Sequence, residues 1–237
     1  MTKSPIAVSL LLAVVLSFSS CATQISGSLQ ADGRADLNIF AALEQRMSAL
    51  IMALAAGAGI PPGTVILDGP TIAASMAAAP GIASVSLANT SPVSIEGQVQ
   101  ASHVGDLLAG GGADFITFER TVGGGGRFTA SLDLASGRAI LDLISPDIAN
   151  YLAALMAPVA TGEVMTRSEY LGLVGMVYGA GIAEEISGAT IRALIDFPGP
   201  IQSVRGGTFS GRRAEFAIPL LDVLVLETPL SYEVVWR

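Results

Sequence analysis

The sequence predicts an α+β fold, in which an antiparallel sheet built from hairpins has helices packed on one face. Three observations lead to this class. Period-two alternation recurs in short segments separated by turn residues, which is typical of hairpins. Helical spacing replaces it in separate blocks, including a helical segment at about 137–187. Hydrophobic residues make up 51% of the chain and charged residues 14%, which favours a packed domain over disorder.

The clearest hairpin lies near the N-terminus. Residues 25–31 and 35–39 alternate with period two on either side of Asp32-Gly33, a dipeptide suited to a type I′ turn. Elsewhere, alternating segments flank turns rich in glycine, asparagine or proline. Two further hairpins and a closing antiparallel meander are therefore expected at 82–101, 115–134 and 191–236.

Helical spacing predicts three helical regions. In residues 43–54 the apolar side chains recur every three or four positions, with polar residues opposite. Residues 69–79 form a second, shorter helix. The segment 137–187 is helical throughout, and Thr166 with Glu169 offers a capping box inside it. We expect this segment to form a helical hairpin that covers the sheet.

The first residues have the pattern of a bacterial lipoprotein signal. A basic leader precedes an apolar run at 5–18 that is too short to span a bilayer comfortably, and two serines follow. The one cysteine of the chain, Cys21, comes next and resembles the end of a lipobox. We expect Cys21 to carry lipid; the alternative is ordinary secretion with a buried, inert Cys21. The expected organisation is a lipoprotein signal peptide at 1–20 and a single α+β envelope domain at 21–237.

The charge balance restricts the partners of the protein. Twelve basic and twenty acidic side chains give a formal net charge of −8, and every cation after Lys3 is an arginine. An acidic domain without a basic stripe argues against nucleic acid and against electrostatic adhesion to anionic lipid. Attachment then depends on the acyl chains. The later apolar runs at 148–160 and 171–183 are too short to span a bilayer, so we interpret both as buried helices.

No combination of residues predicts catalysis. His103, the single histidine, lacks the partners that a zinc site or a catalytic triad needs. The absence of lysine after the leader excludes Schiff-base chemistry and a P-loop, and we interpret Gly123 to Gly126 as a hairpin loop. Glu184 and Glu185 are expected to face water. We therefore predict no enzymatic activity, no metal and no cofactor, with a carboxylate-based enzyme as the third alternative.

Small residues recur along one helical segment. Gly172, Gly175, Gly179 and Ala183 lie three or four positions apart in an otherwise apolar run, which lets another backbone approach closely. Packing within the chain is the simpler interpretation. The alternative is that this helix flanks an apolar cavity. The candidate ligand-binding residues of that alternative are Leu171, Gly175, Gly179 and Ile182.

Both ends of the chain after Cys21 resemble LppM-like lipoproteins. Residues 27–37 are similar to the first hairpin of that family, and residues 195–211, 216–224 and 229–236 are similar to its closing segments. The resemblance implies an envelope-tethered α+β domain with a capacity to hold lipid or glycolipid. It implies no enzymatic activity and no defined binding residues.

Two functional hypotheses follow. The first is a non-enzymatic envelope lipoprotein that binds a lipid-like or other apolar ligand. Its lipid anchor would place it on the outer side of the cytoplasmic membrane or on the outer membrane. The second is a structural or interaction lipoprotein that docks on an envelope protein complex through a sheet edge or an exposed apolar patch.

Overall fold

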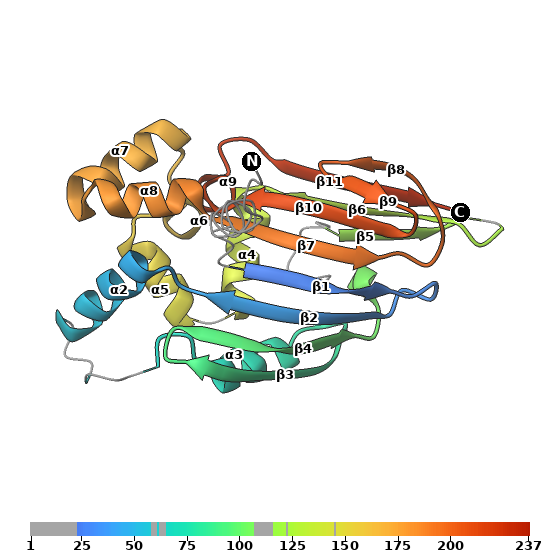
Figure 1. Cartoon of the computed structure of the whole chain (residues 1–237), viewed down its shortest axis with the longest axis horizontal. Helices are drawn as coiled ribbons and strands as arrows, with labels where there is room; N and C mark the ends of the chain where they lie inside the picture. Colours follow the sequence, from blue (N-terminus) through green and yellow to red (C-terminus); the bar gives the residue numbers. More distant parts are fainter. Residues whose placement is uncertain (1–22, 58–60, 62–64, 107–115, 122, 145) are drawn as a thin grey trace, which may run out of the picture.

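Two β-sheets lie face to face, and most of the helices gather at one end of them (Figure 1). The computed structural model describes residues 23–237 apart from 58–60, 62–64, 107–115, 122 and 145. Cys21 and the expected signal peptide therefore lie outside the described residues. Within the described part of the chain, no helix is long and apolar enough to cross a bilayer.

The larger sheet has seven described strands in the order β3-β4-β2-β1-β7-β10-β9. Neighbouring strands are antiparallel except β1 and β7, which run parallel with Thr23 opposite Ile191. The strands are β1 (Thr23–Leu29), β2 (Ala35–Ala42), β3 (Ile82–Ser91), β4 (Ser94–Ala101), β7 (Thr190–Asp196), β9 (Thr208–Ser210) and β10 (Arg213–Pro219).

The smaller sheet has four described strands in the order β5-β6-β11-β8, all antiparallel. These strands are β5 (Ile116–Arg120), β6 (Gly126–Leu132), β8 (Ile201–Arg205) and β11 (Leu230–Trp236). The three predicted hairpins are present. The predicted closing meander is instead divided between the two sheets, because β8 and β11 leave the larger sheet. Alternation of side chains identifies strands and their faces, but it does not determine which strands pair.

The first hairpin differs from its prediction in the type of its turn. The backbone N–H of Gln30 donates to the carbonyl oxygen of Arg34 at 2.7 Å, so three residues, and not two, form the loop. Gly33 has a φ of 90°, whereas Asp32 is not among the residues with positive φ. This matches the three-residue hairpin loop, in which glycine occupies the left-handed position.

The described helices follow the predicted regions. The segment predicted at about 137–187 forms α4 to α8, and Ile72 of α3 packs against Leu87 and Ile95 of the larger sheet. The other long helices lie at the end of the sheets where β1 begins (Figure 1). The helices are α2 (Gln45–Gly57), α3 (Gly69–Ala77), α4 (Leu134–Ile144), α5 (Pro146–Ala154), α6 (Pro158–Thr161), α7 (Arg167–Tyr178), α8 (Ala180–Gly188) and α9 (Leu220–Val225), with a 3-10 turn at Val104–Asp106.

Three apolar clusters hold these elements together. Between the sheets, Trp236 stacks on Phe118 with ring centroids 5.7 Å apart and packs against Phe197 at 5.4 Å. At the helical end, Tyr170 and Val174 of α7 are fully buried among residues of α2, α8 and α9. The third cluster lies beneath α3. One face of the larger sheet, called the inner face here, is covered by these clusters, and the outer face is not.

The glycine-striped segment is two helices, and the expectation of one continuous helix is therefore wrong. Gly179 has a φ of 95° and a ψ of 153°, which ends α7 and begins α8. A Cβ at Gly175 would lie 3.8 Å from the Cβ of Ala183, so this glycine faces the neighbouring helix. A Cβ at Gly172 would meet nothing within 4 Å. Gly175 therefore allows α7 and α8 to pack closely, and Gly179 forms the bend between them.

Candidate functional site

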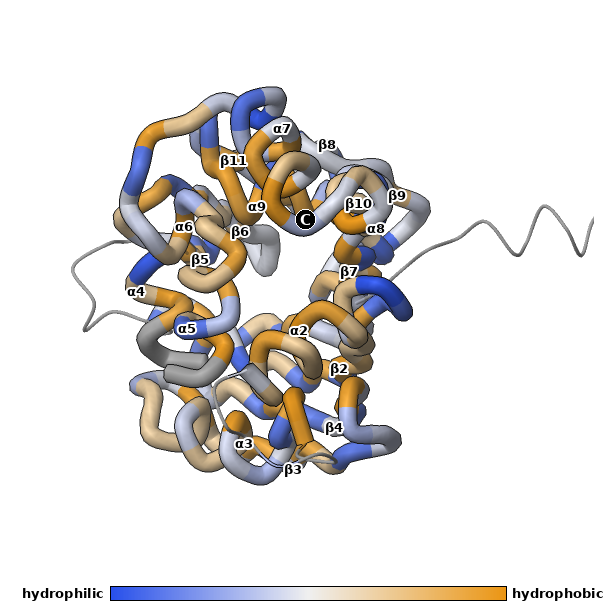
Figure 2. The backbone as a smooth tube through the Cα atoms, turned by 90° about the vertical axis from the view of Figure 1, so that its left-hand side faces the viewer, coloured by the Kyte–Doolittle hydropathy of each residue, from blue (hydrophilic) through white to orange (hydrophobic). Residues whose placement is uncertain are grey.

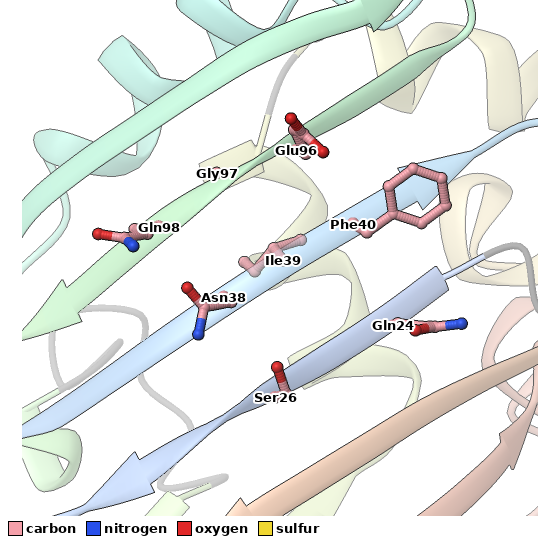
Figure 3. A pocket seen from close by; sticks show the side chains of 8 residues that line it. All are labelled: Gln24, Ser26, Asn38, Ile39, Phe40, Glu96, Gly97 and Gln98. Atoms are coloured by element: carbon pink, nitrogen blue, oxygen red, sulfur yellow. The ribbon is translucent and has the colours of Figure 1, made fainter.

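A shallow groove of about 330 Å³ crosses the outer face of the larger sheet (Figure 3). It extends over β1, β2 and β4, which are adjacent in the sheet. Two cross-strand rows form its surface. Its lining residues are Gln24, Ser26, Asn38, Ile39, Phe40, Glu96, Gly97 and Gln98.

Strand register brings these side chains together. Phe40 of β2 lies between Gln24 of β1 and Glu96 of β4, and Asn38 lies in the same way between Ser26 and Gln98. Because side chains alternate along a strand, residues two apart share a face. The polar side chains of both rows therefore point outward, and the side chain of Phe40, 37% exposed, lies among them (Figure 3).

A glycine in β4 belongs to the same surface. A Cβ at Gly97 would overlap the carbonyl oxygen of Ser86 on β3, so this position needs glycine for the close approach of the two strands. Gly97 pairs with Ile39 on one side and Leu87 on the other. Close strand contact at this point supports the floor of the groove.

The amide side chains in the groove are free to bind. Among the described residues, no hydrogen bond involves the side chains of Gln24, Asn38 or Gln98. The adjacent row differs: the Nε2 of Gln100 donates to Asp36 at 3.0 Å, and its Oε1 accepts from Ser84 at 2.7 Å. An unpaired amide presents two donors and one acceptor oxygen to a ligand. The amides of the groove thus have donors and acceptors available for a ligand, whereas the amide of Gln100 is already bonded to other side chains of the protein.

The charges beside the groove are balanced. Glu96 lies at one end of the row that contains Phe40, and Arg192 of β7 lies opposite Gln24 at the other end. Both side chains are exposed. One carboxylate and one guanidinium across a row of neutral groups favour a ligand without net charge.

Farther along the outer face, charged groups are tied to each other. Arg213 of β10 donates to both carboxylate oxygens of Asp196, at 2.9 and 2.7 Å. Hydrogen bonds from Arg213, together with its positive charge, hold the pKa of Asp196 below its usual value. This pair is structural in character, and it lies at the opposite end of β7 from Arg192.

The predicted ligand-binding residues lie away from this groove, in the α7–α8 hairpin. Leu171 packs against the helical cluster and Ile182 is buried in it. Gly175 faces Ala183, and Gly179 forms the bend between the helices. The structure brings these four residues into one helical hairpin. Ligand binding by them stays a prediction.

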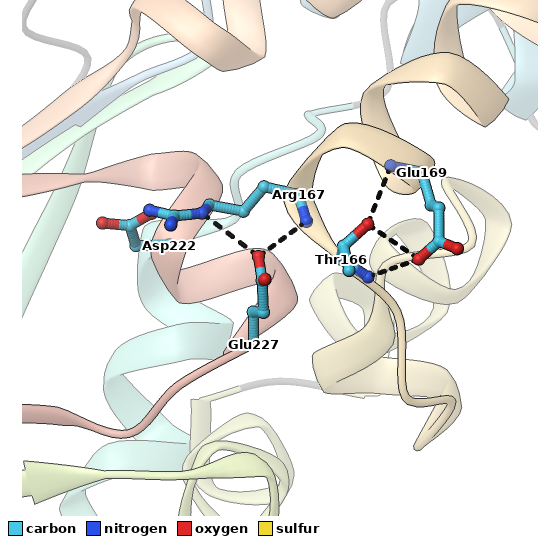
Figure 4. A network of polar contacts seen from close by, with 5 residues as sticks. All are labelled: Thr166, Arg167, Glu169, Asp222 and Glu227. Carbon is cyan, nitrogen blue, oxygen red and sulfur yellow. Dashed lines mark hydrogen bonds and ion pairs between the residues drawn. The ribbon is translucent and has the colours of Figure 1, made fainter.

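A polar network fixes the start of α7 (Figure 4). The predicted capping box is present: the N–H of Glu169 donates to the Oγ1 of Thr166, and the Oε2 of Glu169 accepts from the N–H of Thr166 at 2.8 Å. The hydrogen bonds that the carboxylate accepts from the N–H and the hydroxyl of Thr166 lower the pKa of Glu169. Arg167 donates to Asp222 at 2.9 Å and to Glu227 at 3.3 Å. The network therefore joins α7 to α9 and the segment after it.

His103 packs beneath the first hairpin. Its ring meets Phe118 edge to face at a centroid distance of 5.7 Å, and its Nδ1 lies 3.6 Å from the carboxylate of Asp106. A Cβ at Gly33 would overlap this ring. In the described residues, no group of three or more His, Cys, Asp or Glu side chains could hold a metal ion.

Glu184 and Glu185 have different environments, although both were expected to face water. Glu184 is exposed and pairs with Arg46 at 3.3 Å. Glu185 accepts hydrogen bonds from the backbone N–H groups of Arg46 and Met47, in the first turn of α2. The expectation for Glu185 is therefore wrong, because a partner distant in sequence reaches its carboxylate.

The protein belongs to the α+β class, with one seven-stranded and one four-stranded sheet among its described residues. No family model matches the chain, and no curated protein matches it. A solved structure that does match is the folded domain of LppM from Mycobacterium tuberculosis, with 13% identity over 92% of this chain and 91% of that chain, at a TM-score of 0.35. The two domains have a weak resemblance in fold.

Proposed function

We propose that the protein is a non-enzymatic envelope lipoprotein, tethered to a membrane through lipidated Cys21, which binds the head group of a lipid-like ligand on its outer sheet face. The membrane is the cytoplasmic membrane, on its outer side, or the outer membrane. The groove around Phe40 is the observation that carries the ligand part of the proposal.

The position of β1 supports the tether. One residue, Ala22, separates Cys21 from the first residue of β1. Thr23 is paired on both sides, with Ala41 of β2 and Ile191 of β7. A two-residue extended segment reaches only about 7 Å. Lipid on Cys21 would therefore hold the start of β1 close to the bilayer, and Gln24 and Phe40 of the groove lie beside that start.

The chemistry of the groove supports a hydroxyl-rich, uncharged head group. Unpaired amides of Gln24, Asn38 and Gln98 match hydroxyl groups, which also donate and accept. The exposed ring of Phe40 offers an apolar surface between them. A few fixed polar groups around an apolar surface are what orient a small ligand in a binding site.

Cell fractionation of the Cys21→Ser variant tests the tether. We expect the wild-type protein in the membrane fraction and the variant in the soluble fraction, folded by circular dichroism. Mass spectrometry of the wild-type N-terminus should show an acylated cysteine. A variant that stays in salt-washed membranes with its signal removed would contradict the anchor.

Co-purification tests the ligand. The wild-type protein, extracted from its own membrane in mild detergent, is analysed for bound lipid by mass spectrometry beside Asn38→Ala and Gln98→Ala variants. Loss of one ligand hydrogen bond should lower occupancy by about three- to tenfold. Gln100→Ala, in the neighbouring row, is the matched control and should retain the ligand. Equal occupancy in all four proteins would exclude the groove.

A second candidate function rests on the edge strand β3. This ten-residue strand contains no charged residue and no proline, and no described strand pairs with its free side. Natural sheets usually protect such edges with charges or proline, and partner proteins bind exposed edges by adding a strand. A photo-crosslinking residue at Ser86 would then capture one envelope protein in cells. A matched probe at Ser210 should not capture it.

A further inference from the structure

Two helical segments project from the same end of the molecule, and neither carries charge along its projecting part. Residues 47–57 of α2 and residues 170–183 of the α7–α8 hairpin contain no acidic or basic side chain. Figure 2 views the molecule from this end and shows hydrophobic residues along both helices. The surface formed by these two segments is called the helical tip below.

Large apolar side chains are exposed on the helical tip. Met176 and Val177, in the last turn of α7, are 84% and 53% exposed, and Met52 of α2 is 43% exposed. Gly179 and Ala180, which follow in the chain, are also exposed and uncharged. Single exposed apolar side chains are common on soluble proteins, but adjacent ones on an uncharged projection indicate a contact surface.

Three charged side chains at the base of the tip have polar partners. Arg46 pairs with Glu184, and Glu185 binds the backbone of the first turn of α2. An apolar environment could therefore cover the tip without removing an unpaired charge from water. The net charge of −8 makes an anionic surface an unfavourable partner, whereas an apolar one is compatible.

The start of β1 places the tether at this end. Thr23 pairs with Ala41, shortly before α2, and with Ile191, shortly after α8. Both projecting segments are thus joined to the sheet at the end that a lipid on Cys21 would hold near the bilayer. This step rests on the proposed function.

We infer that the helical tip inserts Met176, Val177 and Met52 into the interface of the bilayer that carries the anchor. Amphipathic helices at an interface bury their apolar side chains about 5–10 Å into the boundary between head groups and acyl chains. The tip adds a non-covalent contact that is too small to hold the protein on the membrane without the anchor. This contact sets the orientation of the domain and leaves the outer sheet face accessible.

The test reproduces the tether chemically, so it does not depend on lipidation in cells. The chain from Cys21 onward is coupled through its one thiol to maleimide-bearing lipid in phosphatidylcholine vesicles. Tryptophan replaces Met176 in one variant and Val177 in a second. The control is Ser210→Trp, at an exposed position of β9 near the opposite end of the larger sheet. Native Trp236 is 3% exposed and provides the background.

Lipids brominated near the head of the acyl chain quench tryptophan that enters the interface. We expect emission from the Met176→Trp and Val177→Trp proteins to fall by about twofold or more and to shift to shorter wavelength, as insertion to that depth requires. Emission from Ser210→Trp and from the parent protein should not change. Equal emission changes at positions 176, 177 and 210 would overturn the inference. Failure of the separate Cys21 acylation assay would overturn the proposed anchor and leave this result to stand independently.

Discussion

Glu185 of α8 caps α2: its Oε1 accepts a hydrogen bond from the backbone N–H of Arg46 at 2.9 Å, and its Oε2 accepts one from Met47 at 2.8 Å. The N–H groups in the first turn of a helix have no partner within the helix, and the dipole there favours an anion. One carboxylate from a distant helix satisfies both needs. The contact also fixes α2 against the α7–α8 hairpin.

Removal of this cap should destabilise the domain. We expect Glu185→Ala to lower the free energy of unfolding by about 1–3 kcal/mol, because two charge-assisted hydrogen bonds are lost. Urea denaturation followed by circular dichroism measures the change. The matched control is Glu184→Ala, which removes only an exposed ion pair and should cost less than about 1 kcal/mol. Equal losses in the two variants would argue against capping by Glu185.

Two glycine-to-alanine substitutions should have opposite effects. Gly97→Ala places a Cβ against the carbonyl oxygen of Ser86, so we expect a loss of about 1–3 kcal/mol. Gly172→Ala meets open space in the middle of α7 and should gain about 0.5–1 kcal/mol through helix propensity. Thermal unfolding of both variants provides the comparison. A stabilising Gly97→Ala would mean that β3 and β4 are farther apart than described.

Tyr170 should contribute to alkaline unfolding. It is fully buried, its hydroxyl donates to the carbonyl oxygen of Leu155 at 3.3 Å, and burial raises its pKa well above the ordinary value. Its contribution to stability is complete below pH 10 and is lost as pH rises further, because only the unfolded chain ionises this group there.

The Tyr170→Phe variant isolates that contribution. Below pH 10 it should lose about 1 kcal/mol for the missing hydrogen bond. Above pH 10 its stability should fall less steeply than that of the wild type, by up to about 1.4 kcal/mol per pH unit. Guanidinium titrations at several pH values measure both slopes. Parallel slopes would show that Tyr170 ionises equally in the folded and unfolded states.

Asp196 should contribute to acid unfolding with the opposite sign. The guanidinium of Arg213 lowers its pKa in the folded protein. The stability that this ion pair supplies is therefore present above about pH 4, the unfolded value, and is lost as pH falls through the lower folded pKa. Asp196→Asn should reduce the acid dependence of the unfolding midpoint. The same reduction in Arg213→Gln would confirm the pair, and an unchanged acid limb in both would refute it.

Local patterns predicted local structure well. The capping box of Thr166 and Glu169 lies within four residues, so the sequence contains all of it. In the same way, side-chain alternation predicted the strands of the hairpins, and the φ preference of glycine predicted the position of the first turn. The turn type at Gly33 was missed because Gln30 and Arg34 close the loop one position farther out than the dipeptide suggests.

Pairing between distant segments could not be predicted. Alternation places Gln24, Asn38 and Gln98 on solvent-facing sides of their strands, but the groove exists only because β2 lies between β1 and β4. The environment of Glu185 depends on α2 for the same reason. The bend at Gly179 was hidden because glycine tolerates both a helix interior and a positive φ, and the apolar run continues across it.

The parallel pairing of β1 with β7 also constrains how the chain acquires its structure. Thr23 can pair with Ile191 only after residues 24–190 have been synthesised. One side of β1 therefore stays unpaired until β7 has formed. Contacts so distant along the chain slow folding. A nascent or truncated chain that ends before β7 leaves one side of β1 unpaired and prone to association. Pairing with β7 therefore removes the exposed edge of β1, whereas β3 remains an edge strand of the described sheet.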